Sequence, residues 1–400
     1  MSKRIACSAA ANLPTVKVSA RGAARLQNGH VWVYRSDIVS ADGVSPGSLV
    51  TVTDRRGQAL GTALYSSASQ IAIRLISREP VADLPALLRK RMAAALRYRE
   101  PIIRDTDAYR VIFSEADFLP GLIVDRYNDV LSVQILTQAM DATPVRETII
   151  SNLTDRLQPA SIFERVDPRI RELEQLPPRD SSRLHGERAT AIFTMNGVQF
   201  HYDALAGQKT GAFLDQRENY AAAALYAGGE GLDVFCYQGG FALHLAPRCS
   251  SITGVDSSRP ALEMADQNAA LNHREIQWIE ANAFDLLRDY AGSGRRYDTI
   301  VVDPPAFAKS KRDLDTAMRG YKELNLRALK MLRPGGLLVT CSCSYHVSQA
   351  DFLQMLAEAS GDAHRGLRIV EMRGQAKDHP VLLNVPETAY LKCVIAHVSN

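Results

Sequence analysis

The chain has 400 residues, of which 46% are hydrophobic and 23% are charged, and its formal net charge is +3. This length exceeds what one hydrophobic core usually organises, so it predicts two or three domains. The composition excludes disordered and fibrous proteins, and no uncharged run approaches the roughly 20 residues that a membrane helix needs.

The cysteines are few and scattered: Cys7, Cys236, Cys249, Cys341, Cys343 and Cys393. Their spacing predicts neither a disulfide framework nor a structural zinc site, because no CxxC pair is followed by a second pair or by two histidines. We therefore expect no metal, no membrane attachment and a reducing, cytoplasmic environment. Residues 1–15 lack the apolar length of a secretory signal and are interpreted as a disordered leader.

Short β-rich runs separated by turn signals extend from Val16 to about Ile76. The runs 31–34, 48–52 and 71–76 predict strands of a small β-barrel or sandwich. Residues 84–104 follow as a predicted helix, because their apolar side chains recur at spacings of three and four. An excess of arginine and lysine on this helix fits a solvated face or a contact with phosphates equally well.

The middle of the chain mixes strand and helix patterns. Residues 122–124 and 130–136 predict strands and residues 145–157 a helix, while Pro177-Pro178 and the polar residues after them mark a boundary. Asn196-Gly197 then separates two β-rich runs and predicts a hairpin with a two-residue turn.

From about residue 206 onward, strands alternate with helices, which is typical of a parallel sheet covered on both faces. Residues 259–272 and 314–332 predict two of the helices. The predicted strands are 231–235, 251–256, 276–280, 299–303 and 337–340.

In such sheets a ligand lies across the carboxyl ends of the strands. The first strand runs from Asp233 into a turn with Gly239 and Gly240, and the second ends at Asp256, where a carboxylate can accept both hydroxyls of a ribose. No GxGxxG is present to hold a pyrophosphate, so NAD and FAD are disfavoured and a nucleoside cofactor without phosphates fits better. The residues of this turn that we expect at the cofactor are Asp233, Phe235, Tyr237, Gly239, Gly240 and Phe241.

Two later strand ends carry candidate catalytic groups. Prolines after Asp303 stiffen the backbone and would hold its carboxylate at the mouth of the cleft, although a capped turn is an alternative. Cys343 would supply a thiolate that adds to C6 of a cytosine and makes C5 electron-rich. Cys341 would lie on the same side in an extended segment, so either sulfur can be the nucleophile, and a buried packing role remains open for both.

The strand-end motifs resemble those of class I methyltransferases. Asp233 to Phe241 is similar to their first motif, with Asp256 and Ser257 after the second strand and Asn282-Ala283 at the adenine edge. Many relatives carry an acid in place of Asn282, and a helix cap explains this asparagine equally well.

With all its motifs assembled, the chain resembles the bacterial large-subunit ribosomal RNA cytosine-C5 methyltransferases that carry an N-terminal PUA domain. The similar blocks include residues 30–34, 67–71, 119–126, 209–217, 319–322 and 378–380, and they extend from about Val16 to the C-terminus. The resemblance implies S-adenosylmethionine as cofactor, large-subunit ribosomal RNA as partner, and allows a homodimer. It also implies an RNA-binding PUA domain over 16–92, a central α+β domain over 93–188 and a Rossmann-like methyltransferase domain over 189–400.

The resemblance also assigns residue roles. Cys343 becomes the nucleophile, and Phe307, Tyr321 and Tyr237 become candidate faces for stacking on a base, with packing as the alternative. In other branches a second cysteine follows the proline of the Asp303 motif, where this chain has Pro305. The segment before the first motif is implied to enclose the cofactor through Lys209, Thr210, Gly211, Phe213, Asp215, Gln216 and Arg217.

Two other functions compete with this interpretation. The Asp-Pro-Pro motif also suits an N-methyltransferase acting on an exocyclic amine or on guanine N7, with Cys343 structural. Alternatively, the chain is a non-catalytic RNA-binding assembly factor that retains a methyltransferase fold.

Overall fold

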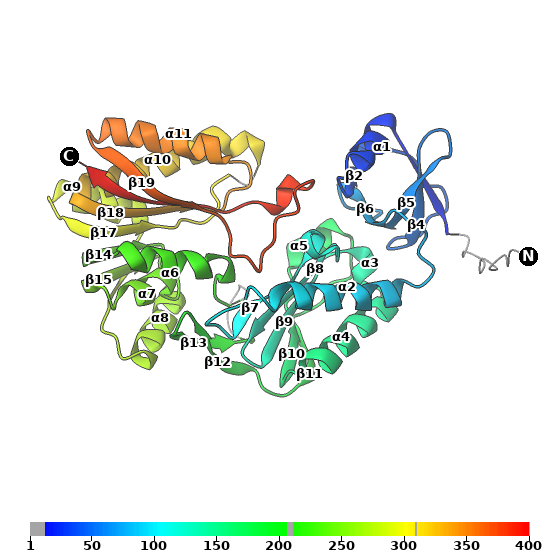
Figure 1. Ribbon diagram of the computed structural model, residues 1–400, viewed down its shortest axis with the longest axis horizontal. Helices are drawn as coiled ribbons and strands as arrows, with labels where there is room; N and C mark the ends of the chain where they lie inside the picture. The colour runs from blue at the N-terminus through cyan, green and yellow to red at the C-terminus, as the bar shows by residue number, and fades with distance from the viewer. Residues whose placement is uncertain (1–12, 206–210, 309, 400) are drawn as a thin grey trace, which may run out of the picture.

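The computed structural model describes residues 13–205, 211–308 and 310–399. Three sheets organise three consecutive parts of the chain, with a two-stranded hairpin between the second and the third (Figure 1). Most of the predicted leader lies outside the described residues, and the first strand begins at its last residue, Thr15. Among the described residues, no helix has the length and apolarity needed to cross a bilayer.

The N-terminal part is a six-stranded sheet with the order β2-β6-β5-β4-β1-β3. The three predicted strands are confirmed within two residues. The helix α1 begins after Ser19, whose hydroxyl accepts a hydrogen bond from the Gly22 amide and so replaces a missing helical partner. The elements are β1 (Thr15–Val18), α1 (Ala20–Gln27), β2 (Trp32–Tyr34), β3 (Ile38–Ser40), β4 (Leu49–Thr53), β5 (Ala59–Tyr65) and β6 (Ile71–Ser77).

Helix α2 (Leu84–Arg99) joins this sheet to the central part and ends before the predicted residue 104. Its N-terminus is capped by Asp83, which accepts a hydrogen bond from the Ala86 amide. Leu88 and Met92 are buried in the hydrophobic cluster of the central domain. The predicted domain boundary at residue 92 therefore falls inside a helix that packs with the central domain.

The central part is a five-stranded sheet with the order β11-β10-β9-β8-β7, antiparallel except for the parallel pair β9 and β10. Both predicted strands and the predicted helix are present. The polar stretch predicted as a boundary contains β11, the edge strand. The elements are β7 (Ala108–Phe113), β8 (Leu122–Tyr127), β9 (Val130–Ile135), α3 (Gln138–Asp141), α4 (Thr143–Leu157), β10 (Ser161–Glu164), α5 (Pro168–Leu173) and β11 (Ser182–Gly186).

The predicted hairpin is confirmed as β12 (Thr190–Met195) and β13 (Val198–Asp203). Asn196 and Gly197 have φ angles of 50° and 81°, the left-handed backbone that a two-residue turn of this kind requires. The hairpin docks on the last domain, because the side chain of Asn268 accepts a hydrogen bond from the His201 amide.

The C-terminal part is a seven-stranded sheet with the order β16-β15-β14-β17-β18-β20-β19. All five predicted strands are present and parallel, whereas the antiparallel strands β20 and β19 were not predicted. The elements are α6 (Arg217–Tyr226), β14 (Gly229–Val234), α7 (Gly240–Leu245), β15 (Cys249–Asp256), α8 (Arg259–Leu271), β16 (Gln277–Glu280), α9 (Ala283–Gly292), β17 (Tyr297–Val302), α10 (Leu314–Met331), β18 (Leu332–Ser342), α11 (Gln349–Asp362), β19 (Gly366–Arg373) and β20 (Lys392–Ser399).

The connectivity of this sheet creates a crevice at its carboxyl edge. From β14 the chain proceeds to β15 and β16 on one side, and then returns to β17 and β18 on the other side. Loops leaving β14 and β17 therefore diverge, which is where open parallel sheets bind their ligands. The two strand ends with candidate catalytic residues, β17 and β18, are neighbours.

The segment from residue 374 to residue 391, here called the strap, connects β19 to β20 and extends from the C-terminal domain toward the other two (Figure 1). Near its start, Asp378 pairs with Arg217 of α6 and accepts a hydrogen bond from the amide of Arg110 in the central domain. Farther along, Glu387 pairs with Arg25 of the N-terminal domain. The strap thus ties the three domains to the site edge of the sheet.

Candidate active site

The turn after β14 has an unusual backbone. Phe235, Tyr237 and Gly239 have φ angles of 68°, 50° and 86°, which is a costly conformation for the two aromatic residues. The turn is held in place because the amides of Phe235 and Cys236 both donate to the Val255 carbonyl of β15. Such strain is concentrated at ligand sites, so the predicted cofactor turn is built as a fixed cradle.

Asp233 lies at the base of this cradle and is 1% exposed. One carboxylate oxygen accepts a hydrogen bond of 2.8 Å from the Ala242 amide, and the other is buried without a partner among the described residues. Burial raises the pKa of Asp233 to about 8. The orphaned oxygen fits the positively charged amino group of S-adenosylmethionine, which would supply the missing hydrogen bond and favour the anion.

A small cavity of about 20 Å³ adjoins Asp233. Its walls come from the hairpin, from the turn after β14 and from the end of β17, and they combine aromatic rings with a few polar groups, as nucleoside sites do. The lining includes Met195, Phe200, Ala212, Phe213, Tyr220, Phe235, Tyr237, Gly240, Phe241 and Asp303.

Asp256 ends β15 in the predicted place. Its two oxygens accept hydrogen bonds of 2.9 Å from the amides of Tyr237 and Ser258, so the carboxylate is fixed against the cradle. Each carboxylate oxygen retains a second lone pair for a ribose hydroxyl. The side chain of Ser257 is exposed beside it.

Asn282 caps α9, which confirms the alternative interpretation of this residue. Its side-chain oxygen accepts from the amides of Phe284 and Asp285, at 2.9 and 3.3 Å. The oxygen is thereby used, and the exposed amide NH₂ group is what remains for a ligand. A donor at this position suits a ring nitrogen of adenine rather than its amino group. The neighbouring Ala283, also predicted at the adenine edge, is buried in the first turn of α9.

The residues of the segment before α6 that was predicted to enclose the cofactor have different surroundings. Lys209 and Thr210 lie outside the described residues. Gly211 adopts a φ of 105° against the rings of Tyr127 and Tyr202, and a Cβ there would come within 2.9 Å of both. Phe213, 39% exposed, contacts the ring of Tyr237 edge-on at the mouth of the cavity.

Asp215, Gln216 and Arg217 of this segment bind other groups of the protein, and two of them bind the strap. The carboxylate of Asp215 accepts a hydrogen bond of 2.6 Å from the hydroxyl of Tyr390, at the end of the strap. The guanidinium of Arg217 is buried and pairs with Asp378. The side chains of Asp215 and Arg217 therefore anchor the strap.

Gln216 is directed at the candidate catalytic carboxylate. Its amide NH₂ donates to Asp303 at 3.0 Å, while its oxygen accepts from the amide of Asn219 at 2.6 Å. Arg373 in turn donates to the oxygen of Asn219 at 2.9 Å. This chain of hydrogen bonds fixes which way each amide faces, and so it orients the Asp303 carboxylate.

The loop that carries Cys343 is joined to the loop that carries Asp303. The hydroxyl of Ser344 accepts from the Ala308 amide at 3.1 Å and shares a hydrogen bond of 2.9 Å with the hydroxyl of Tyr321. Tyr321 is fully buried, so its predicted role in stacking on a base is wrong. The two candidate catalytic residues thus extend from neighbouring strands through loops that are fastened to each other.

The two sulfur atoms have different surroundings. Cys341 is fully buried within β18, opposite Cys393 of β20. Cys343 lies just beyond the end of β18 and is partly exposed. Burial, with the nearby carboxylates of Asp303 and Asp215, raises the pKa of the Cys343 thiol to about 11. Cys343 is therefore partly accessible and lies within electrostatic reach of Asp303, but it needs a positive charge to become a thiolate.

Sequence reasoning found the block 378–380 but neither the strap that carries it nor the roles of Tyr390, in the strap, and Lys392, at the start of β20. The ammonium of Lys392 donates hydrogen bonds to the carbonyls of Ser344 and Tyr390, at 2.6 and 2.9 Å. The motif around Cys343 did contain Ser344, whose bridging role appears only in three dimensions. No pattern in the sequence associates residue 392 with residue 343, because a long excursion separates them.

Models of two known protein families match different parts of this chain. A family model of a PUA-like domain matches residues 16–78, and one of an S-adenosylmethionine-dependent methyltransferase matches residues 145–396. The chain is 39% identical to "Ribosomal RNA large subunit methyltransferase I" of Shewanella denitrificans over 386 residues, which cover 93% of this chain and 96% of that one. Identity to the protein of the same name in Photobacterium profundum is 37%, with the same coverage.

Among solved structures, a putative methyltransferase complexed with SAH has a TM-score of 0.83 and covers 96% of this chain and 99% of its own, at 20% identity. A putative methyltransferase from Streptococcus mutans has a TM-score of 0.81 with the same coverage and identity. These structures share the fold over almost the whole chain.

Proposed function

The chain belongs to the ribosomal RNA large subunit methyltransferase I family, and we propose that it places its methyl group on C5 of a cytosine, with Cys343 as the nucleophile. As a member it is an S-adenosylmethionine-dependent methyltransferase of large-subunit ribosomal RNA. The position of the methyl group and the residue roles are the proposed part. Their main support is that Asp303 and Cys343 follow adjacent strands whose loops Ser344 ties together.

The reaction requires the thiolate of Cys343 to add to C6 of the target ring, forming a sulfur–carbon bond and pushing electrons toward C5. Asp303, held by Gln216, would act in its carboxylic acid form, donating a hydrogen bond to N3 and so stabilising the negative charge that develops on the ring. Bound S-adenosylmethionine supplies the methyl group to C5. Loss of the C5 proton to a base then expels the thiolate and restores the aromatic ring, so the enzyme is regenerated.

The cofactor would be held by residues from three strand ends. Asp233 suits its amino group, Asp256 its ribose and Asn282 its adenine ring, while Phe213 and Tyr237 flank the opening.

The target cytosine must leave any helical stack to reach the thiol, because C5 and C6 are otherwise covered by neighbouring bases. A ribosomal RNA substrate and the unpaired cysteines of the described residues support action in the cytoplasm. Self-association stays a prediction.

The direct test incubates the protein with labelled S-adenosylmethionine and unmodified large-subunit ribosomal RNA, followed by nucleoside mass spectrometry. We expect all label in 5-methylcytidine. Label in an N-methylated nucleoside would support the competing N-methyltransferase interpretation, and cofactor binding without transfer would support the assembly factor.

Cofactor affinity should depend on pH through Asp233. Because its pKa is raised to about 8, most of the carboxyl group is protonated at lower pH and must ionise to bind an ammonium group. We expect affinity, measured by calorimetry, to rise up to roughly tenfold per pH unit from about pH 6 toward pH 8. Asp233→Asn should bind weakly with little of this dependence, and exposed Asp266→Asn on α8 should match the wild type.

Gln216→Leu should slow methyl transfer about 10- to 100-fold, because the Asp303 carboxylate loses the hydrogen bond that orients it. The dissociation constant of S-adenosylmethionine should change far less, since Gln216 faces Asp303. Single-turnover rates and calorimetry separate the two effects. The matched control is Gln267→Leu on the exposed face of α8, and an unaltered rate in Gln216→Leu would contradict the positioning role.

A further inference from the structure

Lys392 begins β20 directly opposite Ser342, the last residue of β18. Paired residues of two antiparallel strands project to the same face, so Lys392 extends past the end of β18 toward the loop that holds Cys343. Its ammonium donates to the carbonyl of Ser344 at 2.6 Å and to that of Tyr390 at 2.9 Å. These charge-assisted hydrogen bonds fix the cation beside the nucleophile's own loop.

In the described part of the chain, the charged side chains near Cys343 other than Lys392 disfavour its thiolate form. The carboxylates of Asp303 and Asp215 lie within electrostatic reach of the thiol and oppose its ionisation, and the phenols of Tyr321 and Tyr390 also lie within this reach. Within the described part of the chain, Lys392 is the cation that favours the thiolate. A nucleophilic cysteine needs such a partner, because the thiol itself does not react.

We propose that Lys392 is a positioning residue that stabilises the Cys343 thiolate and so sets the amount of active nucleophile. The proposal rests on the role of Cys343 in the proposed function. Neutral Lys392 accepts the thiol proton, which leaves a thiolate beside an ammonium group. When the thiolate is expelled from the product, the same pair is restored, and no other reactant is consumed.

The titration of both groups is compatible with this exchange. Burial lowers the pKa of Lys392 to about 8, with Cys343 acting in the opposite direction. The pKa of the Cys343 thiol, about 11, lies above that of Lys392, so the neutral pair predominates and the thiolate–ammonium pair is a minor form. Lys392 sets how large this minor, reactive form is.

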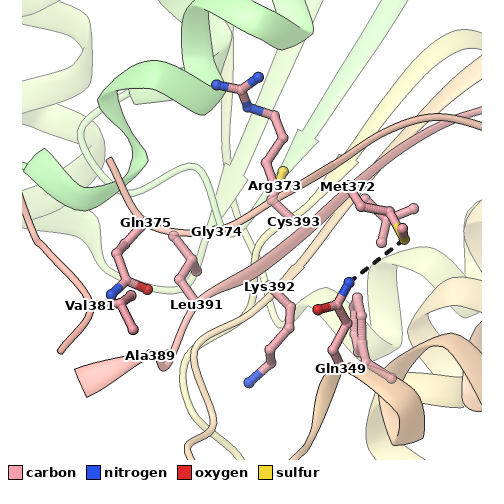
Figure 2. A pocket seen from close by; sticks show the side chains of 12 residues that line it. Gln349, Met372, Arg373, Gly374, Gln375, Val381, Ala389, Leu391, Lys392 and Cys393 are labelled. Carbon is pink, nitrogen blue, oxygen red and sulfur yellow. Dashed lines mark hydrogen bonds between the residues drawn. The ribbon is translucent and has the colours of Figure 1, made fainter. Parts of the chain in front are cut away.

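Lys392 can also exchange protons with solvent. It lines a cavity of about 280 Å³ between the strap and α11, with Gln375 and Leu391 on one side and Gln349 and Met372 on the other (Figure 2). A space of this size, into which Gln349, Gln375 and Arg373 bring polar groups, has room for several water molecules. The lysine is thus placed between a solvent-accessible cavity and the buried side of the nucleophile.

The test measures alkylation of Cys343 by iodoacetamide in the full-length protein, with the modified peptide identified by mass spectrometry. It compares the wild type with Lys392→Gln, Lys392→Arg and the control Lys377→Gln, an exposed strap lysine paired with Glu218. Removing the cation should raise the pKa of Cys343 by about one unit. The thiolate fraction then falls about tenfold while its intrinsic reactivity rises about threefold, so alkylation near pH 8 should slow about threefold.

Lys377→Gln should alkylate at the wild-type rate, and Lys392→Arg, whose side chain is always a cation, at least as fast as the wild type. In methylation assays, Lys392→Gln should lower kcat with little change in the KM for RNA. Equal alkylation rates in the wild type and in folded Lys392→Gln would overturn the proposal, as would a defect confined to KM, which indicates an RNA phosphate contact. Nucleoside analysis of the wild-type product tests the proposed function separately, because alkylation does not depend on which atom is methylated.

Discussion

Cys343→Ala is expected to bind S-adenosylmethionine normally and to lose methyl transfer by at least about a thousandfold, because no other group can form the bond to C6. The thiol of Cys343 is partly exposed and within electrostatic reach of Asp303, whereas Cys341 is fully buried within β18, opposite Cys393 of β20. Calorimetry should find the cofactor dissociation constant unchanged, and single-turnover methylation should be undetectable.

The contrast is Cys341→Ala, which removes the neighbouring sulfur from the same strand. We expect it to lower stability through the small cavity it creates and to retain activity within about tenfold. If Cys343→Ala kept full transfer, Cys343 would be structural and an N-methyltransferase mechanism would account for the Asp-Pro-Pro motif. If Cys341→Ala abolished methyl transfer instead, Cys341 rather than Cys343 would be the nucleophile.

The second large effect concerns the strap. Asp378 is fully buried, accepts a hydrogen bond of 2.7 Å from the Arg110 amide and pairs through both oxygens with Arg217, which is itself 2% exposed. Asp378→Ala leaves the guanidinium of Arg217 buried without its partner. Breaking such a pair typically costs about 3–5 kcal/mol, so we expect a loss of that size in urea unfolding.

The pair should also make stability sensitive to acid. Although burial alone would raise it, His379 and Arg217 hold the pKa of Asp378 below its ordinary value. A depressed carboxyl pKa stabilises the fold above the unfolded pKa of about 4, and that contribution is lost as the pH falls below it. Asp378→Ala should lack this part of the acid transition.

A matched control is Asp362→Asn on α11, whose carboxylate pairs with Lys322 at the surface. Exposed pairs contribute at most about 1 kcal/mol, so this variant should unfold nearly like the wild type. Equal, small losses in Asp362→Asn and Asp378→Ala would contradict the strap's role in joining the domains.

The features that could be predicted from the sequence are those coded locally. The parallel strands carry continuous apolar runs, the hairpin turn needs Asn196-Gly197, and Asp233 and Asp256 stand at the carboxyl ends of their strands, so each signal lies within a few residues. Asn282 was ambiguous because a helix cap and a ligand contact require the same residue type at the same place.

The contacts that could not be predicted join distant segments. Arg217 looked like part of the cofactor segment, but its partner Asp378 is brought to it only by the strap. Alternation along an extended segment placed Cys341 and Cys343 on one side, whereas β18 ends at Ser342 and frees the second cysteine. The approach of Lys392 depends on the pairing of β18 with β20, which no local pattern encodes.

The most direct test of the central claim traps the bond between sulfur and RNA. Large-subunit ribosomal RNA transcribed with 5-fluorocytidine can accept the thiolate at C6 and the methyl group at C5, but it then has no C5 proton to lose, so expulsion of the thiolate is blocked. We predict a stable protein–RNA complex, formed only with S-adenosylmethionine present, whose digestion yields a Cys343 peptide linked to a methylated, fluorinated nucleotide. Methyl transfer to this RNA with no covalent complex, or a complex through any other residue, would contradict the account.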